Sequence, residues 1–183
     1  MKRLFEQYKE KVIPALKEKF GYKNEMQVPK LAKVSINVGI GRGLKDNDYL
    51  ESVKKSLQRI TGQQPVETKA KTSISNFKIR EGMVVGVRVT LRGWRMYDFI
   101  EKLVNITLPR VRDFRGLDPD NFDGHGNYSI GFKEHIAFPE IRSDELENIH
   151  GLEVNITTTA DTDEEGYELL KLMGFPFKEK DNK

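Results

Sequence analysis

Two segments in which apolar and polar residues strictly alternate constrain the fold of this chain most. The first runs from Lys33 to Val38 and the second from Val84 to Arg92. Because successive side chains of a strand point to opposite faces of a sheet, each segment is predicted to be a strand with one apolar and one polar face. Strands of this kind form an open sheet that is covered on one side only, since a strand buried on both faces is apolar throughout.

Helical spacing accounts for most of the other apolar residues. It predicts helices over residues 4–20, 46–61, 96–108 and 162–173, with a kink or a join at Pro14 and an end before Pro109. Shorter stretches predict two more strands, at residues 66–71 and 153–159. The interleaved pattern predicts an α+β fold: a single domain over residues 1–183, with an open, mostly antiparallel sheet and helices packed on one face.

Charge is distributed very unevenly along the chain. Residues 1–115 contain 25 Lys and Arg against 12 Asp and Glu, a net charge of +13, whereas residues 116–183 contain 6 against 16, a net charge of −10. Such asymmetry is typical of a basic part that contacts nucleic acid or a membrane surface. From charge alone, two solvated faces of opposite sign explain it equally well.

Composition excludes several classes of protein. No apolar run approaches the roughly 20 residues that a membrane-spanning helix needs, and no apolar segment follows the first residues, so neither a span nor a secretory signal is expected. The chain has no cysteine, which excludes disulfides, thiolate zinc sites and cysteine nucleophiles. This composition is compatible with a reducing cytoplasm.

The glycine run from Gly39 to Gly43 is the nearest match to a nucleotide-binding motif. It contains G-x-G, but Leu44 occupies the third glycine position of G-x-G-x-x-G, and no G-K-[ST] sequence is present. A structural turn is therefore favoured over a dinucleotide site. A nucleotide-dependent enzyme that uses this turn remains a rival hypothesis.

A second group of polar residues suggests metal or acid–base chemistry but does not fit either. In a calcium loop that begins at Asp118, Phe122 and Asp123 occupy positions that need Asp or Asn and then Gly. The histidines lack H-E-x-x-H spacing, and no G-x-S-x-G is present. Turn chemistry explains an Asp- and Gly-rich loop better, so no metal, cofactor or catalytic residue is predicted. The residues considered are Asp118, Asp120, Asp123, His125, Glu134 and His135.

The basic features point together to nucleic acid. If the two alternating strands are neighbours, Lys33, Ser35 and Asn37 lie beside Arg88, Thr90 and Arg92 on one cationic surface that also carries hydroxyl and amide groups. The segment 69–80 adds four cations and Phe77. The strands carry no interleaved aromatic residues, so contacts with RNA shape and backbone are expected, not base stacking on the sheet. A protein–protein scaffold that binds through its acidic half is the remaining alternative.

Several long strings of this sequence are distinctive: Ile60–Pro65, Lys69–Gly82, Val89–Gly93, Leu108–Gly116, Phe122–Ser129 and Gly174–Phe177. In this order they resemble one family, that of the fifth protein of the bacterial large ribosomal subunit, which binds 5S rRNA. The resemblance extends over residues 22–177, and Thr72 and His125 stand where basic residues are usual.

This resemblance implies a ferredoxin-like domain without the RRM aromatics and a ribosome-bound, cytoplasmic structural protein. The implied partners are 5S rRNA, 23S rRNA, P-site tRNA, neighbouring 5S rRNA-binding ribosomal proteins and a basic protein of the small-subunit head. Family positions for 5S rRNA match Asn37, Gly39, Thr90 and Arg92, to which we add Lys33, Ser35, Gly41, Gln63, Lys69, Lys71 and Arg88. A protruding loop at residues 72–82, with Ser73, Ser75, Asn76, Phe77, Lys78 and Arg80, is expected to contact tRNA. Arg110, Arg112, Glu140, Asp144, Glu145 and Glu147 are assigned to the bridge with the small subunit.

Overall fold

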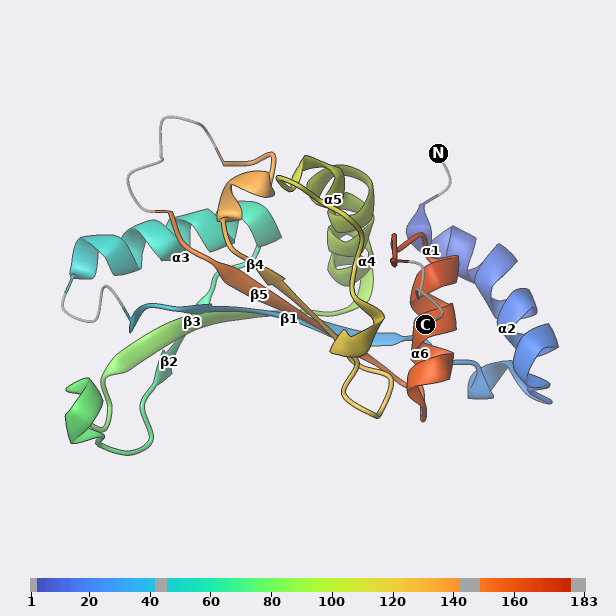
Figure 1. The fold of residues 1–183 in the computed structure, drawn as a ribbon, viewed down its shortest axis with the longest axis horizontal. Helices are drawn as coiled ribbons and strands as arrows, with labels where there is room; N and C mark the ends of the chain where they lie inside the picture. The colour runs from blue at the N-terminus through green and yellow to red at the C-terminus, as the bar shows by residue number, and fades with distance from the viewer. Residues whose placement is uncertain (1–2, 42–45, 142–148, 179–183) are drawn as a thin grey trace. The chain divides into compact units, whose positions relative to one another are not determined.

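The computed structural model describes residues 3–41, 46–141 and 149–178 (Figure 1). They form an α+β fold with one sheet, whose strands follow the order β2-β3-β1-β5-β4. The strands are β1 (Leu31–Gly39), β2 (Val66–Lys69), β3 (Val84–Leu91), β4 (Tyr128–Phe132) and β5 (Leu152–Thr158). The longer helices are α2 (Ile13–Phe20), α3 (Asn47–Thr61), α4 (Gly93–Lys102) and α6 (Asp163–Leu172). No helix in these ranges is long and apolar enough to cross a membrane.

The strand order contains the predicted ferredoxin-like arrangement. Strand β3 lies between β1 and β2, which are joined through α3. Strand β1 lies between β3 and β5, which are separated in the chain by α4 and by the additional strand β4. Strands β2 and β3 are antiparallel. Strand β4 is added at the edge beside β5, and it falls where the sequence predicted no strand. Within β4, Tyr128, Ile130 and Phe132 are buried and the residues between them are not. Five residues of alternation are too few to distinguish a strand from the irregular loop that precedes it.

The chain divides into two compact units. One comprises residues 1–34, 91–130 and 155–183, and the other comprises residues 35–90 and 131–154. Strands β1, β3, β4 and β5 each have residues in both units. The single domain over residues 1–183 therefore stays a prediction.

In the second unit, α3 covers one face of the sheet. Asp46 caps this helix, because its carboxylate accepts hydrogen bonds from the amides of Asp48 (3.0 Å) and Tyr49 (3.2 Å). On its outer rim Lys54 pairs with Glu67 of β2. That hydrogen bond lowers the pKa of the Glu67 carboxyl below its ordinary value. Since Glu67 lies opposite Val87 of β3, the pair shows which face the helix covers.

In the first unit, two long helical runs each contain a proline directly after a π-helical turn. The first run comprises α1 (Leu4–Gln7), a π turn (Tyr8–Val12) and α2, with Pro14 in the first turn of α2. The second comprises α4, a π turn (Leu103–Thr107) and α5 (Leu108–Arg110), with Pro109 in the first turn of α5. A π turn is wider than an α turn, so it leaves space for the proline ring. Its different hydrogen-bond pattern also accommodates the backbone N–H that proline lacks. The predicted join at Pro14 is confirmed, because α2 begins at Ile13. The second run ends at Arg110, two residues beyond the predicted end at Leu108.

The Asp- and Gly-rich loop at residues 122–128 is fastened to the start of α6. The Asp163 carboxylate accepts hydrogen bonds from the amides of Gly124 (3.2 Å) and Gly126 (2.9 Å). The Asp123 carboxylate accepts the side-chain amide of Asn127 (2.7 Å), which lowers the pKa of this carboxyl. These carboxylates therefore stabilise the turns of the loop through hydrogen bonds. Within the described ranges, no group of three or more His, Asp or Glu residues could hold a metal ion.

Candidate RNA interface

One face of β1 and β3 is open and carries the polar residues that alternation assigned to it. Along β1, every second residue from Val34 to Val38 is buried, and the residues between are partly exposed. Along β3, Val87 and Val89 are buried, whereas the residue between them is exposed. The open-face residues are Lys33, Ser35 and Asn37 on β1 and Arg88 and Thr90 on β3. Because β1 and β3 are neighbours in the sheet, the two rows adjoin, as predicted.

Strand β2 extends this surface by residues that the sequence did not identify. Val66, which is 68% exposed, lies opposite Arg88, and Thr68 lies opposite Gly86. A Cβ at Gly86 would lie 2.8 Å from the Thr68 hydroxyl oxygen and 2.9 Å from the Val38 carbonyl oxygen. Gly86 therefore lets the three strands approach closely, and no side chain projects from the open face at this position.

Strand β5 adds a further polar row on its less buried side. Leu152, Val154, Ile156 and Thr158 are buried, and the residues between them are at least partly exposed. These are Glu153, Asn155 and Thr157. The Ser129 hydroxyl of β4 donates to the Asn155 side-chain oxygen (2.7 Å). The alternation of residues 152–158 carried the signal for this row, which is neutral or acidic, so the cations of the open face lie on β1 and β3.

The residues at the strand ends are exposed. Arg92 follows β3 with an extended backbone (φ −140°, ψ 165°), so the alternation of Arg88 and Thr90 continues into it. Gly39 ends β1, and a Cβ at Gly39 or Gly41 would meet nothing within 4 Å. Packing therefore does not require either glycine, and both leave space for another backbone to approach. Residues 42–45, which include the rest of the glycine run, lie outside the described residues.

Gln63 has a contact that anchors the sheet. Its side-chain amide donates to the Thr90 carbonyl oxygen (3.2 Å), and its backbone amide donates to the Thr61 hydroxyl (3.3 Å). The Thr61 hydroxyl in turn donates to the Leu57 carbonyl oxygen (2.7 Å) at the end of α3. Gln63 thus holds the end of α3 against the backbone of β3, beneath the predicted RNA-binding residue Thr90.

The basic loop at residues 72–82 forms an extension of the β2–β3 hairpin (Figure 1). At its base, Ala70 and Met83 are hydrogen-bonded (2.8 Å), and at its tip the backbones of Ile74 and Ile79 exchange two hydrogen bonds (2.9 and 3.1 Å). A 3-10 turn (Ser75–Phe77) and the left-handed conformation of Lys78 (φ 55°) close the tip. The loop therefore has a defined internal structure.

The side chains of this loop project into solvent. Phe77 is 69% exposed, and Ser75, Asn76, Lys78 and Arg80 are at least partly exposed as well. The Ser73 hydroxyl, by contrast, accepts the Glu81 amide (2.9 Å) and stabilises the loop itself. The remaining two cations of the segment 69–80, Lys69 and Lys71, are exposed where β2 leads into the loop.

The residues assigned to the small-subunit bridge are placed only in part. Arg110 ends α5 and Arg112 follows it, and both are exposed. Glu140 is partly buried in the second unit. Asp144, Glu145 and Glu147 lie outside the described residues, so their assignment to the bridge stays a prediction.

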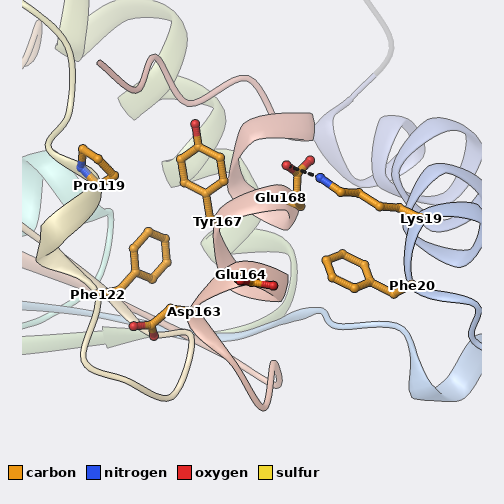
Figure 2. A pocket seen from close by; sticks show the side chains of 8 residues that line it. All are labelled: Lys19, Phe20, Pro119, Phe122, Asp163, Glu164, Tyr167 and Glu168. Atoms are coloured by element: carbon orange, nitrogen blue, oxygen red, sulfur yellow. Dashed lines mark ion pairs between the residues drawn. The ribbon is translucent and has the colours of Figure 1, made fainter. Parts of the chain in front are cut away.

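A hollow of about 420 Å³ in the first unit does not resemble a phosphate site (Figure 2). It contains three carboxylates and a single cation, Lys19, which pairs with Glu168. The Asp163 carboxylate already binds loop amides, as described above. Negative charge of this kind repels RNA. The lining residues are Lys19, Phe20, Pro119, Phe122, Asp163, Glu164, Tyr167 and Glu168.

Two family profiles match consecutive parts of the chain. The profile described as ribosomal protein L5 matches residues 24–80, and the profile that describes the C-terminus of the same ribosomal family matches residues 84–177. Together they span all five strands and residues 72–80 of the basic loop.

Relatives over the full length agree with these matches. A protein of Halothermothrix orenii named large ribosomal subunit protein uL5 is 56% identical over 179 residues, 98% of this chain and 100% of that protein. Proteins of the same name from Desulforapulum autotrophicum and Thermotoga maritima are 58% and 55% identical over 178 and 175 residues. These matches cover 97% and 96% of this chain and 99% and 95% of the relatives. The chain therefore belongs to the ribosomal protein L5 family, a family of structural ribosomal proteins.

Proposed function

We propose that this protein binds 5S rRNA in the large ribosomal subunit through the open face of β1 and β3. The observation that carries the proposal is the alternation of burial on these two strands. It leaves a partly exposed row of cations and hydrogen-bonding groups with helices behind it. The names of its relatives, which are large-subunit proteins, support the same assignment.

Binding would depend mainly on the RNA backbone. Lys33, Arg88 and Arg92 can neutralise phosphates and release their counterions, while Ser35, Asn37 and Thr90 can donate to or accept from sugar hydroxyls and base edges. The exposed Gly39 and Gly41 leave room for the RNA backbone at the end of β1. The hydrogen bond from Gln63 to Thr90 holds the surface in shape.

The other contacts belong to the same proposal. The exposed tip of the basic loop would contact P-site tRNA, and Lys69 and Lys71 would contact rRNA at its base. Arg110, Arg112 and the acidic residues 140–147 would help to bridge to a basic protein of the small-subunit head. Binding to 23S rRNA and to neighbouring 5S rRNA-binding proteins completes the proposed set of partners.

A binding titration tests the central claim. The full-length protein is titrated with 5S rRNA, with tRNA as competitor, at several salt concentrations. Preferential binding of 5S rRNA, with an affinity that falls as salt rises, is expected. Equal binding of 5S rRNA and tRNA would contradict the proposal, and a salt-independent affinity would contradict the phosphate-based mechanism.

Replacing Arg92 with alanine is expected to weaken 5S rRNA binding about tenfold and to make the slope of log affinity against log salt shallower by about one. The reason is that the exposed guanidinium at the end of β3 would neutralise one phosphate. Lys171→Ala is the matched control, because it removes an exposed cation from α6, a helix to which the proposal assigns no RNA contact. An unchanged slope in Arg92→Ala would exclude this phosphate contact.

Replacing both Lys78 and Arg80 with alanine is expected to loosen P-site tRNA in assembled ribosomes by about tenfold and to spare 5S rRNA binding. Both side chains are exposed at the tip of the loop, and each can form one salt-dependent phosphate contact. tRNA dissociation from purified ribosomes gives the first value and filter binding of 5S rRNA gives the second. An equal loss of 5S rRNA binding would place the loop in the docking surface.

A further inference from the structure

Trp94 is the most exposed aromatic residue outside the basic loop in the described part of the chain. It lies in the first turn of α4, two residues after the last residue of β3's polar row, and 59% of its surface is exposed. The buried residues of this helix are Met96, Tyr97, Phe99 and Ile100. The indole therefore lies outside the core, although exposing so large an apolar ring costs free energy.

The indole is held from one side by another aromatic ring. The rings of Phe5 and Trp94 meet edge to face, with centroids 4.8 Å apart and an interplanar angle of 72°. Phe5 in turn packs against the buried Tyr97, with centroids 5.0 Å apart. These contacts fix the tryptophan while much of its surface stays in solvent. A fixed and exposed aromatic surface is what a flat ligand needs for stacking.

The surroundings of this ring are rich in cations. The Lys9 ammonium lies 4.6 Å from the centroid of the Phe5 ring. Arg92 precedes Gly93 and Arg95 follows Trp94, and both arginines are exposed. In the described part of the chain, the charged residues within four positions of Phe5 or Trp94 are Arg3, Glu6, Lys9, Arg92, Arg95 and Asp98. Positive charge thus exceeds negative charge by two, which favours a flat ligand that carries phosphate.

We propose that the exposed surface of Trp94 stacks on an unpaired base of the bound 5S rRNA, with Arg92 and Arg95 at the adjoining phosphates. This inference rests on the proposed function and adds to it a contact of a different kind. The polar rows of β1 and β3 carry no aromatic residue, so they can hold the RNA backbone but cannot stack on a base. Trp94 supplies that stacking surface where β3 leads into α4.

The fluorescence of Trp94 provides a direct test, because it is the only tryptophan of the chain. The full-length protein is titrated with 5S rRNA while its indole emission is recorded, and binding is measured in parallel by filter retention. Stacking on a base is expected to quench the emission, and the quenching should saturate at the same RNA concentration as the retention. Retention without any change in emission would overturn the stacking contact.

Variants separate stacking from charge. Trp94→Ala is expected to weaken 5S rRNA binding about tenfold, and this factor should be the same at every salt concentration. Arg92→Ala, in contrast, is expected to change the slope of log affinity against log salt. Trp94→Phe, which keeps a smaller ring, should recover part of the affinity. Ile106→Ala removes an exposed apolar side chain from the same helical run and should leave binding unchanged. Thermal unfolding of each variant checks that the protein stays folded when the contact between Trp94 and Phe5 is changed.

The outcomes distinguish this inference from the proposed function. If the wild-type protein prefers 5S rRNA but Trp94→Ala binds it with unchanged affinity, the stacking contact is wrong and the proposed function stands. The same holds if Trp94→Phe binds no better than Trp94→Ala. If the wild-type protein shows no preference for 5S rRNA by either readout, the proposed function fails and this inference fails with it.

Discussion

Replacing Gly166 with alanine is expected to destabilise the protein by about 3 kcal/mol, although alanine favours helices by about 1 kcal/mol over glycine. Gly166 is buried in α6 and touches the loop that contains Gly126. An added Cβ would lie 2.6 Å from the Gly126 carbonyl oxygen and 2.8 Å from its Cα. Since both are backbone atoms, the loop itself has to move. Urea unfolding at equilibrium measures the loss.

The cost arises because the displaced loop is held by several hydrogen bonds. The Thr158 hydroxyl donates to the Gly126 carbonyl oxygen (2.8 Å), and the Asp163 carboxylate accepts the Gly126 amide (2.9 Å). Each such bond contributes about 1 kcal/mol. Gly131→Ala is the matched control, because a Cβ there meets nothing within 4 Å on an exposed strand position. A Gly166→Ala protein as stable as the control would show that the loop and α6 adapt freely.

Much of the fold follows from local patterns in the sequence. The two alternating segments predicted β1 and β3 and their open face, and the caps at Asp46 and Gly62 mark the ends of α3. Pro14 shows where local rules stop. Proline interrupts an α-helix by rule, but the π turn at residues 8–12 widens the backbone and the helix continues through Pro14 to Phe20. A π turn depends on packing around the whole run, so residue spacing alone does not reveal it.

The candidate site divides in the same way. Lys33, Ser35 and Asn37 were identified from alternation because each strand face can be derived from its own residues. Strand order, in contrast, depends on contacts between distant segments. Alternation assigns Asn155 to the polar side of its own strand, but local patterns offered no reason to place that strand beside β1 or to pair Asn155 with Ser129. Residues that act through distant partners, such as Gln63 beneath Thr90, are likewise visible only once the strands are assembled.

Two buried histidines form a second feature that distant contacts create. His135 and His150 stack with their ring centroids 4.0 Å apart and an interplanar angle of 1°. The Nδ1 atom of His150 lies 3.3 Å from the Gly151 carbonyl oxygen, and its buried Nε2 has no hydrogen-bond partner in the described part of the chain. Burial, and to a lesser extent the adjacent His135, lowers the pKa of His150 to about 4.

Acidification is therefore expected to destabilise the protein through His150. In the folded protein its pKa is about 4, whereas the ordinary value of 6.5 applies to the unfolded chain. Between these values the unfolded chain binds the extra proton, so the contribution of His150 to stability is fully present above pH 6.5 and is lost as the pH falls toward 4. The complete loss amounts to about 3 kcal/mol, of which about 2 kcal/mol falls between neutral pH and about pH 5.

His150→Phe isolates this contribution because it keeps a ring beside His135 but cannot bind a proton. Unfolding in urea at neutral pH and at about pH 5 should show that the variant loses about 2 kcal/mol less on acidification than the wild-type protein. His125→Phe, at an exposed loop position, should lose as much as the wild type. Because each comparison is made within one variant, a change in overall stability does not affect it. Equal losses in all three proteins would mean that His150 takes up its proton in the folded state, and the stacked pair would then have to open at mildly acidic pH.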